Sequence, residues 1–379
     1  DTVLMNQNPE NSLIGRVEYN FKAWKNALQW STFYEVGSGL EQKREFLYIQ
    51  VNSGQGIYTW IDYNEDGIKD LNEFEIAQFV DQADYIRVFV PSNTYVNTYS
   101  NEFNQSFYWR PERIWSKKKG FLGLMSRFSD QARFRVNKKT NSIENGNVFN
   151  PFENRVADSA LISTNAFIRN ALFFNRTSSI FAAGYTFQQN QSKTLLASGF
   201  DSRTNRYNEL NLRWNITRKF AVVLIGQQGV KQVLADYTSG RDYSLDYQWL
   251  KSTISYQPST NFRLTLETRG VTKKNVISGG AGETCQIIDM GSTFKYNQTD
   301  KGSFQGEFKV LKIEYDGNVN SAIGFEMLEA LRPGINYTWT IGYQKTVSKN
   351  LQITFQYLGR KSENTRIIHT GGMEIRAFF

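Results

Sequence analysis

The sequence has little cysteine, histidine or proline, and it has no long apolar run. Its single cysteine, Cys285, excludes an internal disulfide, and its six prolines leave room for long, uninterrupted β-strands. Its only histidine is His369. The longest apolar run, residues 220–226, is far shorter than the roughly 20 residues that a transmembrane helix requires, so the sequence excludes such a helix.

The formal net charge of +8 could favour a nucleic acid partner. The sequence has no basic run and no known nucleic-acid motif, so we expect no such partner. Attraction to a lipid bilayer with anionic headgroups, including lipopolysaccharide, is the milder explanation. The chain starts at Asp1 without a signal peptide, and we expect a processed or partial chain with no lipid anchor at this end, because Asp1 is not cysteine.

Apolar and polar residues alternate along much of the chain, as they do in strands with one apolar face. The alternation is cleanest in six stretches, residues 122–136, 208–216, 262–269, 337–344, 351–357 and 366–379. In two further stretches, 243–256 and 304–315, the alternation slips phase midway, and we expect bulges there. The 28 Phe, 20 Tyr and 8 Trp suit the aromatic girdles of a membrane barrel.

This pattern predicts an all-β fold. A soluble sandwich or propeller would use strands of about five or six residues, whereas these stretches are longer. We therefore predict a transmembrane antiparallel β-barrel, with about 14–16 strands in this chain. Residues 1–36 would form the first barrel strands, 37–97 a small α+β extracellular insertion, and 98–379 the rest of the transmembrane β-barrel.

The lengths of the connections predict how the strands are oriented, because periplasmic turns are short and extracellular loops are long. Short joins are expected at residues 117–119, 177–178, 217–219, 258–260 and 347–350. Long loops are expected at residues 137–158, 189–203 and 316–334. Counting back from a periplasmic carboxy terminus gives about fifteen strands, and this odd number suggests that the chain belongs to a longer barrel.

The last fourteen residues, 366–379, place Met373 and Ile375 on one face and Glu374 and Arg376 on the other. This stretch ends on Phe379. It resembles the closing strand of a bacterial outer-membrane β-barrel, in which a terminal aromatic residue helps the assembly machinery to recognise the chain.

Residues 62–73 have the spacing of an EF-hand calcium loop, with a glycine at position 6 for the sharp turn. The expected ligands to a structural calcium ion are Asp62, Asn64, Asp66, the carbonyl of Ile68, Asp70 and Glu73. The preceding residues 56–61 alternate like a strand, and residues 71–80 have helical spacing. The alternative is an acidic, glycine-containing turn that binds no metal.

Two parts of the chain are similar to segments of large, poorly characterised outer-membrane proteins of the Bacteroidota. The first comprises residues 54–64 and 71–75, around the calcium loop, and the second comprises residues 331–339, 359–362 and 369–371. The resemblance implies a surface-exposed barrel from a diderm bacterium. It implies no activity or substrate.

We expect no catalysis, because His369 has no partner at a recognisable spacing and its parity places it on the lipid side. Six charged residues of the opposite parity should be the mixed-charge lining of a lumen: Arg133, Arg135, Glu209, Arg213, Glu267 and Arg269. The expected role is transport, translocation or scaffolding within a cell-surface protein complex. A surface binding protein or adhesin, and a porin for small solutes, remain as alternatives.

Overall fold

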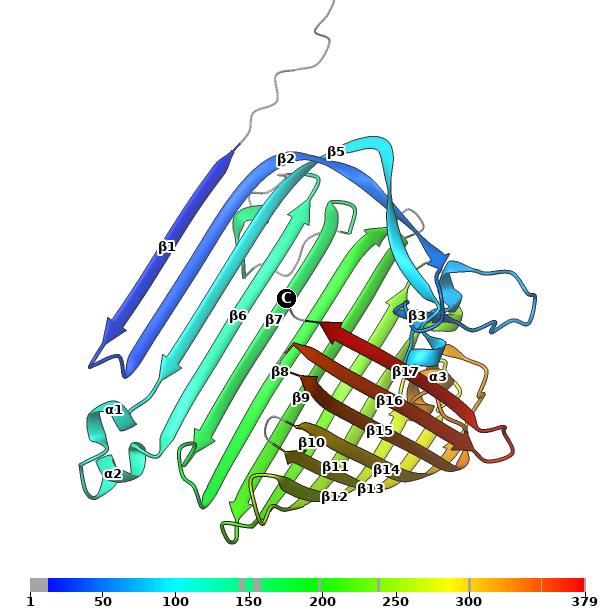
Figure 1. Ribbon diagram of the computed structural model, residues 1–379. Coiled ribbons are helices and arrows are strands. Elements are labelled where there is room, and N and C mark those ends of the chain that lie inside the picture. Colours follow the sequence, from blue (N-terminus) through cyan, green and yellow to red (C-terminus); the bar gives the residue numbers. More distant parts are fainter. Residues whose placement is uncertain are drawn as a thin grey trace, which may run out of the picture.

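The computed structural model describes residues 13–142, 147–152, 158–196, 199–236, 239–298, 301–348 and 350–377. Within these ranges seventeen strands form one antiparallel sheet, and all but two of them, β3 and β4, are at least ten residues long. The fifteen long strands pair in sequence order, and the sheet curls round without closing between β1 and β17 (Figure 1). They are β1 (Ile14–Ala23), β2 (Leu28–Gln50), β5 (Tyr85–Trp109), β6 (Phe128–Thr140), β7 (Leu161–Phe174), β8 (Phe181–Leu196), β9 (Gly199–Asn215), β10 (Phe220–Ala235), β11 (Tyr243–Tyr256), β12 (Phe262–Asn275), β13 (Thr284–Gln298), β14 (Gly302–Asp316), β15 (Gly334–Ser348), β16 (Leu351–Ser362) and β17 (Ile368–Ala377). The predicted all-β class and strand number are confirmed.

Short connections gather at one end of the strands, which we call the turn end, and the longer ones gather at the other, the loop end. The predicted short joins at 177–178, 217–219 and 258–260 fall between strands at the turn end, and the one at 347–350 overlaps the last two residues of β15 there. The predicted loop at 189–203 is wrong, because β8 and β9 continue to Leu196 and Gly199. The alternation fades there because both faces are polar.

The predicted strand over residues 122–136 begins later than expected. Residues 110–127 form a longer turn-end connection with two short helices, α1 (Glu112–Trp115) and α2 (Phe121–Met125), so the predicted short join at 117–119 is wrong. Pro111 lacks the amide that a strand ladder needs, and Gly120 adopts a positive φ of 68°. Leu122 and Leu124 therefore lie in α2, and the strand starts at Phe128.

The insertion is smaller than residues 37–97. Strands β2 and β5 continue as a pair beyond the sheet, so that only residues 51–84 lie between them. This two-stranded arch carries β3 (Tyr58–Trp60), β4 (Phe74–Ile76) and the 3₁₀ turns η1 (Leu71–Glu73) and η2 (Val80–Gln82). The predicted helix at 71–80 is wrong, because Phe74 pairs with Trp60 in a strand and stacks on Tyr48.

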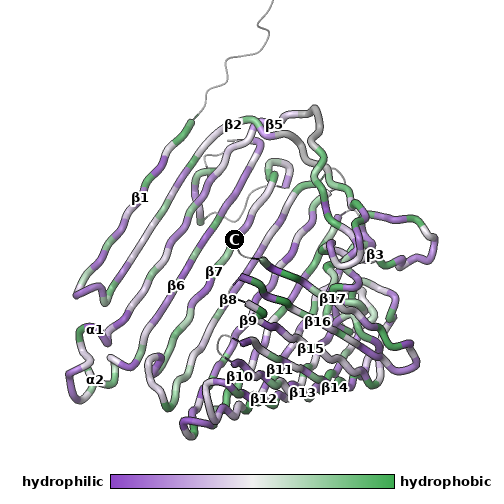
Figure 2. Tube along the Cα trace, viewed as in Figure 1, coloured by the Kyte–Doolittle hydropathy of each residue, from purple (hydrophilic) through white to green (hydrophobic). Residues whose placement is uncertain are grey.

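The apolar side of the strands changes from one face to the other along their length. We call the face that carries Arg263 and Glu267 the inner face, and the opposite face the outer face. On β12, outer-face Leu264 and Leu266 lie toward the turn end, whereas inner-face Val271 is buried toward the loop end. Figure 2 shows the resulting mixture of apolar and polar residues along the strands.

The same change explains the phase slips that the sequence shows in 243–256 and 304–315. Strand β14 places Phe304 and Phe308 on the outer face and Leu311 and Ile313 on the inner face, with unbroken register to both neighbours. Strand β11 also pairs without a shift. The predicted bulges are wrong, because the apolar residues move to the other face of the strand while the backbone pairing stays in register.

A helix covers the inner face at the loop end. Helix α3 (Ala322–Leu328) belongs to the connection between β14 and β15, and its Ser321 N-cap accepts a hydrogen bond from the Gly324 amide. Met327 and Leu328 pack on Leu245 and Ile287 within one buried apolar cluster. None of the described helices is long and apolar enough to cross a membrane.

A second loop-end segment covers the outer face instead. Residues 147–152, which include η3 (Asn147–Phe149), lie against β5 and β6. The Phe152 ring contacts Phe103 and stacks on Phe134, and the buried Asn101 side chain donates to the Val148 carbonyl. Loops thus cover both faces of the sheet near its loop end.

Candidate functional site

The inner face encloses a cavity of about 1280 Å³. Strands β6 to β11 supply most of its wall, and β4 of the insertion and α3 border it. Amide side chains recur along the wall, including Asn137, Asn165, Asn190 and Asn205. A large cavity with amide and charged side chains along its wall can hold a hydrated solute or a polar polymer. It cannot serve as a dry hydrophobic core.

The six predicted lining residues all lie on the inner face, as their parity predicts. Several have partners there: Glu267 pairs with Lys251 at 2.8 Å, Arg135 approaches Glu102 at 3.5 Å, and Arg213 donates to the Ser178 carbonyl. Arg269 pairs with Asp289 and Glu329. The wall is therefore partly neutralised by its own ion pairs.

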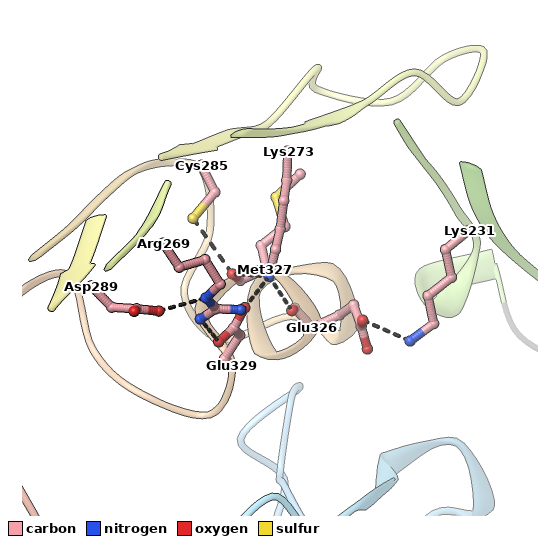
Figure 3. Close-up of polar contacts among 8 residues, drawn as sticks. All are labelled: Lys231, Arg269, Lys273, Cys285, Asp289, Glu326, Met327 and Glu329. Atoms are coloured by element: carbon pink, nitrogen blue, oxygen red, sulfur yellow. Dashed lines mark hydrogen bonds and ion pairs between the residues drawn. The ribbon is translucent and has the colours of Figure 1, made fainter. Parts of the chain in front are cut away.

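Helix α3 is held on this wall by charged contacts at its carboxy-terminal end (Figure 3). The Lys273 ammonium donates to the Met327 carbonyl at 3.0 Å and to the Glu329 carboxylate at 3.0 Å. The same carboxylate accepts from Arg269 at 2.8 Å, and Lys231 reaches Glu326 at 2.6 Å. Cations at a helix carboxy terminus interact favourably with its exposed carbonyls.

Glu329 stays ionised in this setting. Its burial alone would raise the pKa of the carboxyl, but the Lys273 ammonium and the Arg269 guanidinium outweigh burial and hold the pKa below its usual value. Glu329 also has a positive φ of 54°, a left-handed conformation that ends the helix and directs the chain back toward β15. The helix end is thus fixed by both charge and backbone.

The insertion is attached to the inner rim by two buried arginines that are remote from it in sequence. Arg241, between β10 and β11, donates to the Phe74 carbonyl at 3.0 Å and pairs with Glu75 at 3.3 Å. Arg360, on β16, binds both carboxylate oxygens of Asp81. The Arg360 guanidinium also lies over the Phe79 ring, 4.2 Å from its centroid.

These contacts show that the insertion lies across the loop end. The arch of β2 and β5 carries it over the curl of the sheet toward β16 and β17 (Figure 1). Burial raises the pKa of Glu75, and the Arg241 guanidinium opposes that effect. We call residues 51–84 the lid.

The predicted calcium loop has part of the expected geometry. Asp62 accepts hydrogen bonds from the amides of Asp66 and Gly67, at 3.2 and 2.8 Å, and Asp66 accepts from Ile68 at 2.6 Å. Asn64 lies in the same turn, with its amide 2.9 Å from Asp66. Asp62, Asn64 and Asp66 are therefore brought together around Gly67, which has the positive φ expected at position 6.

Glu73 is engaged elsewhere. Its carboxylate is buried and accepts from the Trp60 indole at 2.8 Å and from the Tyr63 amide at 3.3 Å, so it joins β3 to η1. Within the described part of the chain, no three carboxylate, histidine or cysteine side chains form a group that could hold a metal ion. Of the six predicted ligands, three are brought together, and calcium binding stays a prediction.

Residues 359–362 of β16 and 369–371 of β17 contribute to the rim. Strand β17 has the predicted faces, although Phe379 lies outside the described residues. His369 is on the outer face, 2.7 Å from the Tyr357 hydroxyl. A carbon added at Gly359 would lie 2.2 Å from the Trp339 ring, so this glycine makes room for the indole beside Arg360.

The sequence did not single out Arg241, and it showed no sign of the role of Arg360. Nothing in the alternation distinguishes an inner-face arginine that binds a distant loop from one that faces water. No known protein family matches the chain, and no curated protein matches it.

We expect Arg360→Ala to release the lid and to leave the sheet intact. Loss of Arg360 leaves the Asp81 carboxylate half-buried without its partner, and breaking a buried ion pair costs up to about 3 kcal/mol. Limited proteolysis should therefore cut residues 51–84 faster in the variant, while the melting temperature of the sheet changes little. Lys361→Ala, which removes an exposed neighbouring charge, is the control and should be cut like the parent. Equal cleavage of all three proteins would contradict the anchoring role.

Proposed function

We propose that this chain forms the wall of an outer-membrane β-barrel that acts as a transport or translocation component of a cell-surface complex. The observation that carries the proposal is the apolar band on the outer face toward the turn end. On β13 it extends over nine residues, from Ile288 and Met290 to Phe294 and Tyr296. A tilted strand needs about 9–11 residues to cross a bilayer.

The short turns of this barrel would face the periplasm and the lid would face the cell exterior. Beyond the band, outer-face residues such as Thr272 and Lys274 are polar, which suits strands that project from the membrane. The similarity to outer-membrane proteins of the Bacteroidota supports the same location.

A cavity lined by amide and charged side chains beneath a lid favours a gated conduit over an open porin. The lid is joined to the rim by ion pairs and hydrogen bonds, and such contacts can open without unfolding the wall. A surface binding protein or adhesin is the second candidate. The large exposed apolar residues of the lid favour it, but they are aliphatic and include Ile57, Ile68, Ile76 and Val80. Protein-binding surfaces are enriched in aromatic residues, and none of these four residues is aromatic.

Single-channel conductance tests the conduit. The full-length protein in a planar bilayer should conduct weakly, and replacing residues 53–83 by a two-glycine turn should raise the conductance severalfold. Replacing residues 147–152, which lie on the outer face, should leave the conductance unchanged. If the lid deletion inserts normally and conducts no better than the parent, the chain is a scaffold or adhesin.

The direction of the edge strands indicates how such a barrel would close. Strands β1 and β17 both run from the loop end to the turn end, so direct pairing would be parallel. Unpaired edges do not occur in lipid hydrocarbon. An antiparallel barrel therefore needs an odd number of further strands between these two edges. A second copy of these strands cannot supply them. When both copies have the same orientation in the membrane, β17 of one copy and β1 of the other also run in the same direction, so their pairing would again be parallel.

Cysteine crosslinking tests this closure. Phe355→Cys with Met373→Cys places two cysteines on paired positions of β16 and β17 and should form a disulfide. Cysteines at Val17, Tyr19 or Phe21 of β1, each combined with Met373→Cys, should form none in the full-length protein in membranes. A disulfide between β1 and β17 would show that the fifteen strands close on themselves.

We further propose that calcium stabilises the lid and takes no part in chemistry. Asp62, Asn64 and Asp66 would bind it, with the Ile68 carbonyl, Asp70 and Glu73 completing the set after Glu73 exchanges its present hydrogen bonds. The carboxylates of Asp62, Asp66, Asp70 and Glu73 repel one another when they are held in one short loop, and a cation removes that repulsion. Extracellular sites of this type have dissociation constants of about 10⁻⁴ to 10⁻³ M.

Chelation should therefore make residues 51–84 sensitive to protease, and excess calcium should restore protection in proportion to the logarithm of its concentration. Asp62→Ala should have the same sensitivity with or without chelator. Glu65→Ala removes the same charge from a position that is not a predicted ligand, and it should keep the calcium response. A protease pattern that is identical with calcium and with chelator would identify the loop as an ordinary acidic turn.

A further inference from the structure

Two arginines face each other across neighbouring strands of the inner wall. Arg133 on β6 and Arg169 on β7 are directly paired in the register, and both side chains are on the inner face and exposed. Directly opposed like charges destabilise a sheet. Among the described residues neither arginine forms an ion pair or a side-chain hydrogen bond, so nothing in the wall offsets their repulsion.

Most other inner-face cations have carboxylate partners. Lys251 pairs with Glu267, Lys231 with Glu326, and Arg269 with Glu329. The carboxylate nearest to the arginine pair along β5, Glu102, instead approaches Arg135 at 3.5 Å. Glu209 is two strands away from Arg169 and makes no ion pair with it. The missing counter-charge is therefore local to Arg133 and Arg169.

The residues around the pair are neutral hydrogen-bonding groups. Ser106 is the register partner of Arg133 on β5, and Gln188 is the partner of Arg169 on β8. Phe167, two residues before Arg169, lies on the same face and lines the cavity with Arg133. This setting has donors for an anion, and neither Glu102 nor Glu209 forms an ion pair with Arg133 or Arg169.

We propose that Arg133 and Arg169 form a binding site for an oxyanion group, a carboxylate, phosphate or sulfate, carried by a solute or polymer in the cavity. Each guanidinium offers a planar pair of donors that matches such a group, and side chains directly opposite on neighbouring strands have Cβ atoms about 4.5–5.5 Å apart. Both forks can therefore reach one anion. The site deepens the proposed conduit, because it would select negatively charged cargo where the wall faces the lumen.

Residue-resolved arginine modification tests the site without requiring conductance. The full-length protein in detergent is treated with phenylglyoxal, with and without inorganic phosphate, and modified arginines are quantified by mass spectrometry. Phosphate should slow the modification of Arg133 and Arg169 by about tenfold, an effect that corresponds to one strong charged contact. Sodium chloride at equal ionic strength should not.

Variants of Arg169 distinguish a site that needs both arginines from a general electrostatic effect of phosphate on arginine modification. Arg169→Gln should remove phosphate protection of Arg133, and Arg169→Lys should weaken it, because lysine keeps the charge and lacks the fork. Arg206→Gln, an equal charge change on the outer face, should leave protection intact. Equal phosphate effects on Arg133 in the parent and in Arg169→Gln would overturn the site. If the lid deletion does not raise the conductance but phosphate still protects Arg133 and Arg169, the conduit is refuted and the anion site is not.

Discussion

The structure depends on a single constraint: each long strand must satisfy two different surroundings along its length. Toward the turn end, the outer face is apolar and the inner face is charged, as Leu264 and Arg263 show on β12. Toward the loop end, the apolar side chains change to the inner face, where Val271 and Ile287 pack under α3. Successive side chains of a strand point to opposite faces. Apolar residues can therefore move from even to odd positions along a strand, and so change face, without a bulge in the backbone.

The change of face accounts for the positions of the loops. An inner face that is apolar near the loop end must be covered, and Met327 and Leu328 of α3 cover it. Below α3 the wall is charged, and the ion pairs of Lys273 and Arg269 with Glu329 fix the end of the helix at this level. The lid then rests on this covered rim, and Phe79 joins the two by packing against the buried cluster.

Alternation alone predicted the all-β class, the number of long strands, most of the turn-end connections and the side on which Arg133 or Glu267 lies. It could not predict where β2 and β5 end, because apolar and polar residues no longer alternate in the arch beyond the sheet, although the two strands stay paired there. It misread β14 as bulged, because a change of apolar face and a slip of register look alike in sequence. The lid anchors Arg241 and Arg360 depend on contacts between residues 166 or more positions apart, which no local pattern encodes.

The exposure to lipid of outer-face residues along one strand tests most directly whether the strand leaves the membrane where its apolar residues change face. Single cysteines at outer-face Leu264, Leu266, Thr272 and Lys274 of β12 can be labelled with a fluorophore and placed in bilayers that contain a quenching lipid. We expect strong quenching at 264 and 266 and little at 272 and 274, because the outer face leaves the membrane where the apolar residues change sides. Equal quenching at all four positions, or none at 264 and 266, would contradict the account.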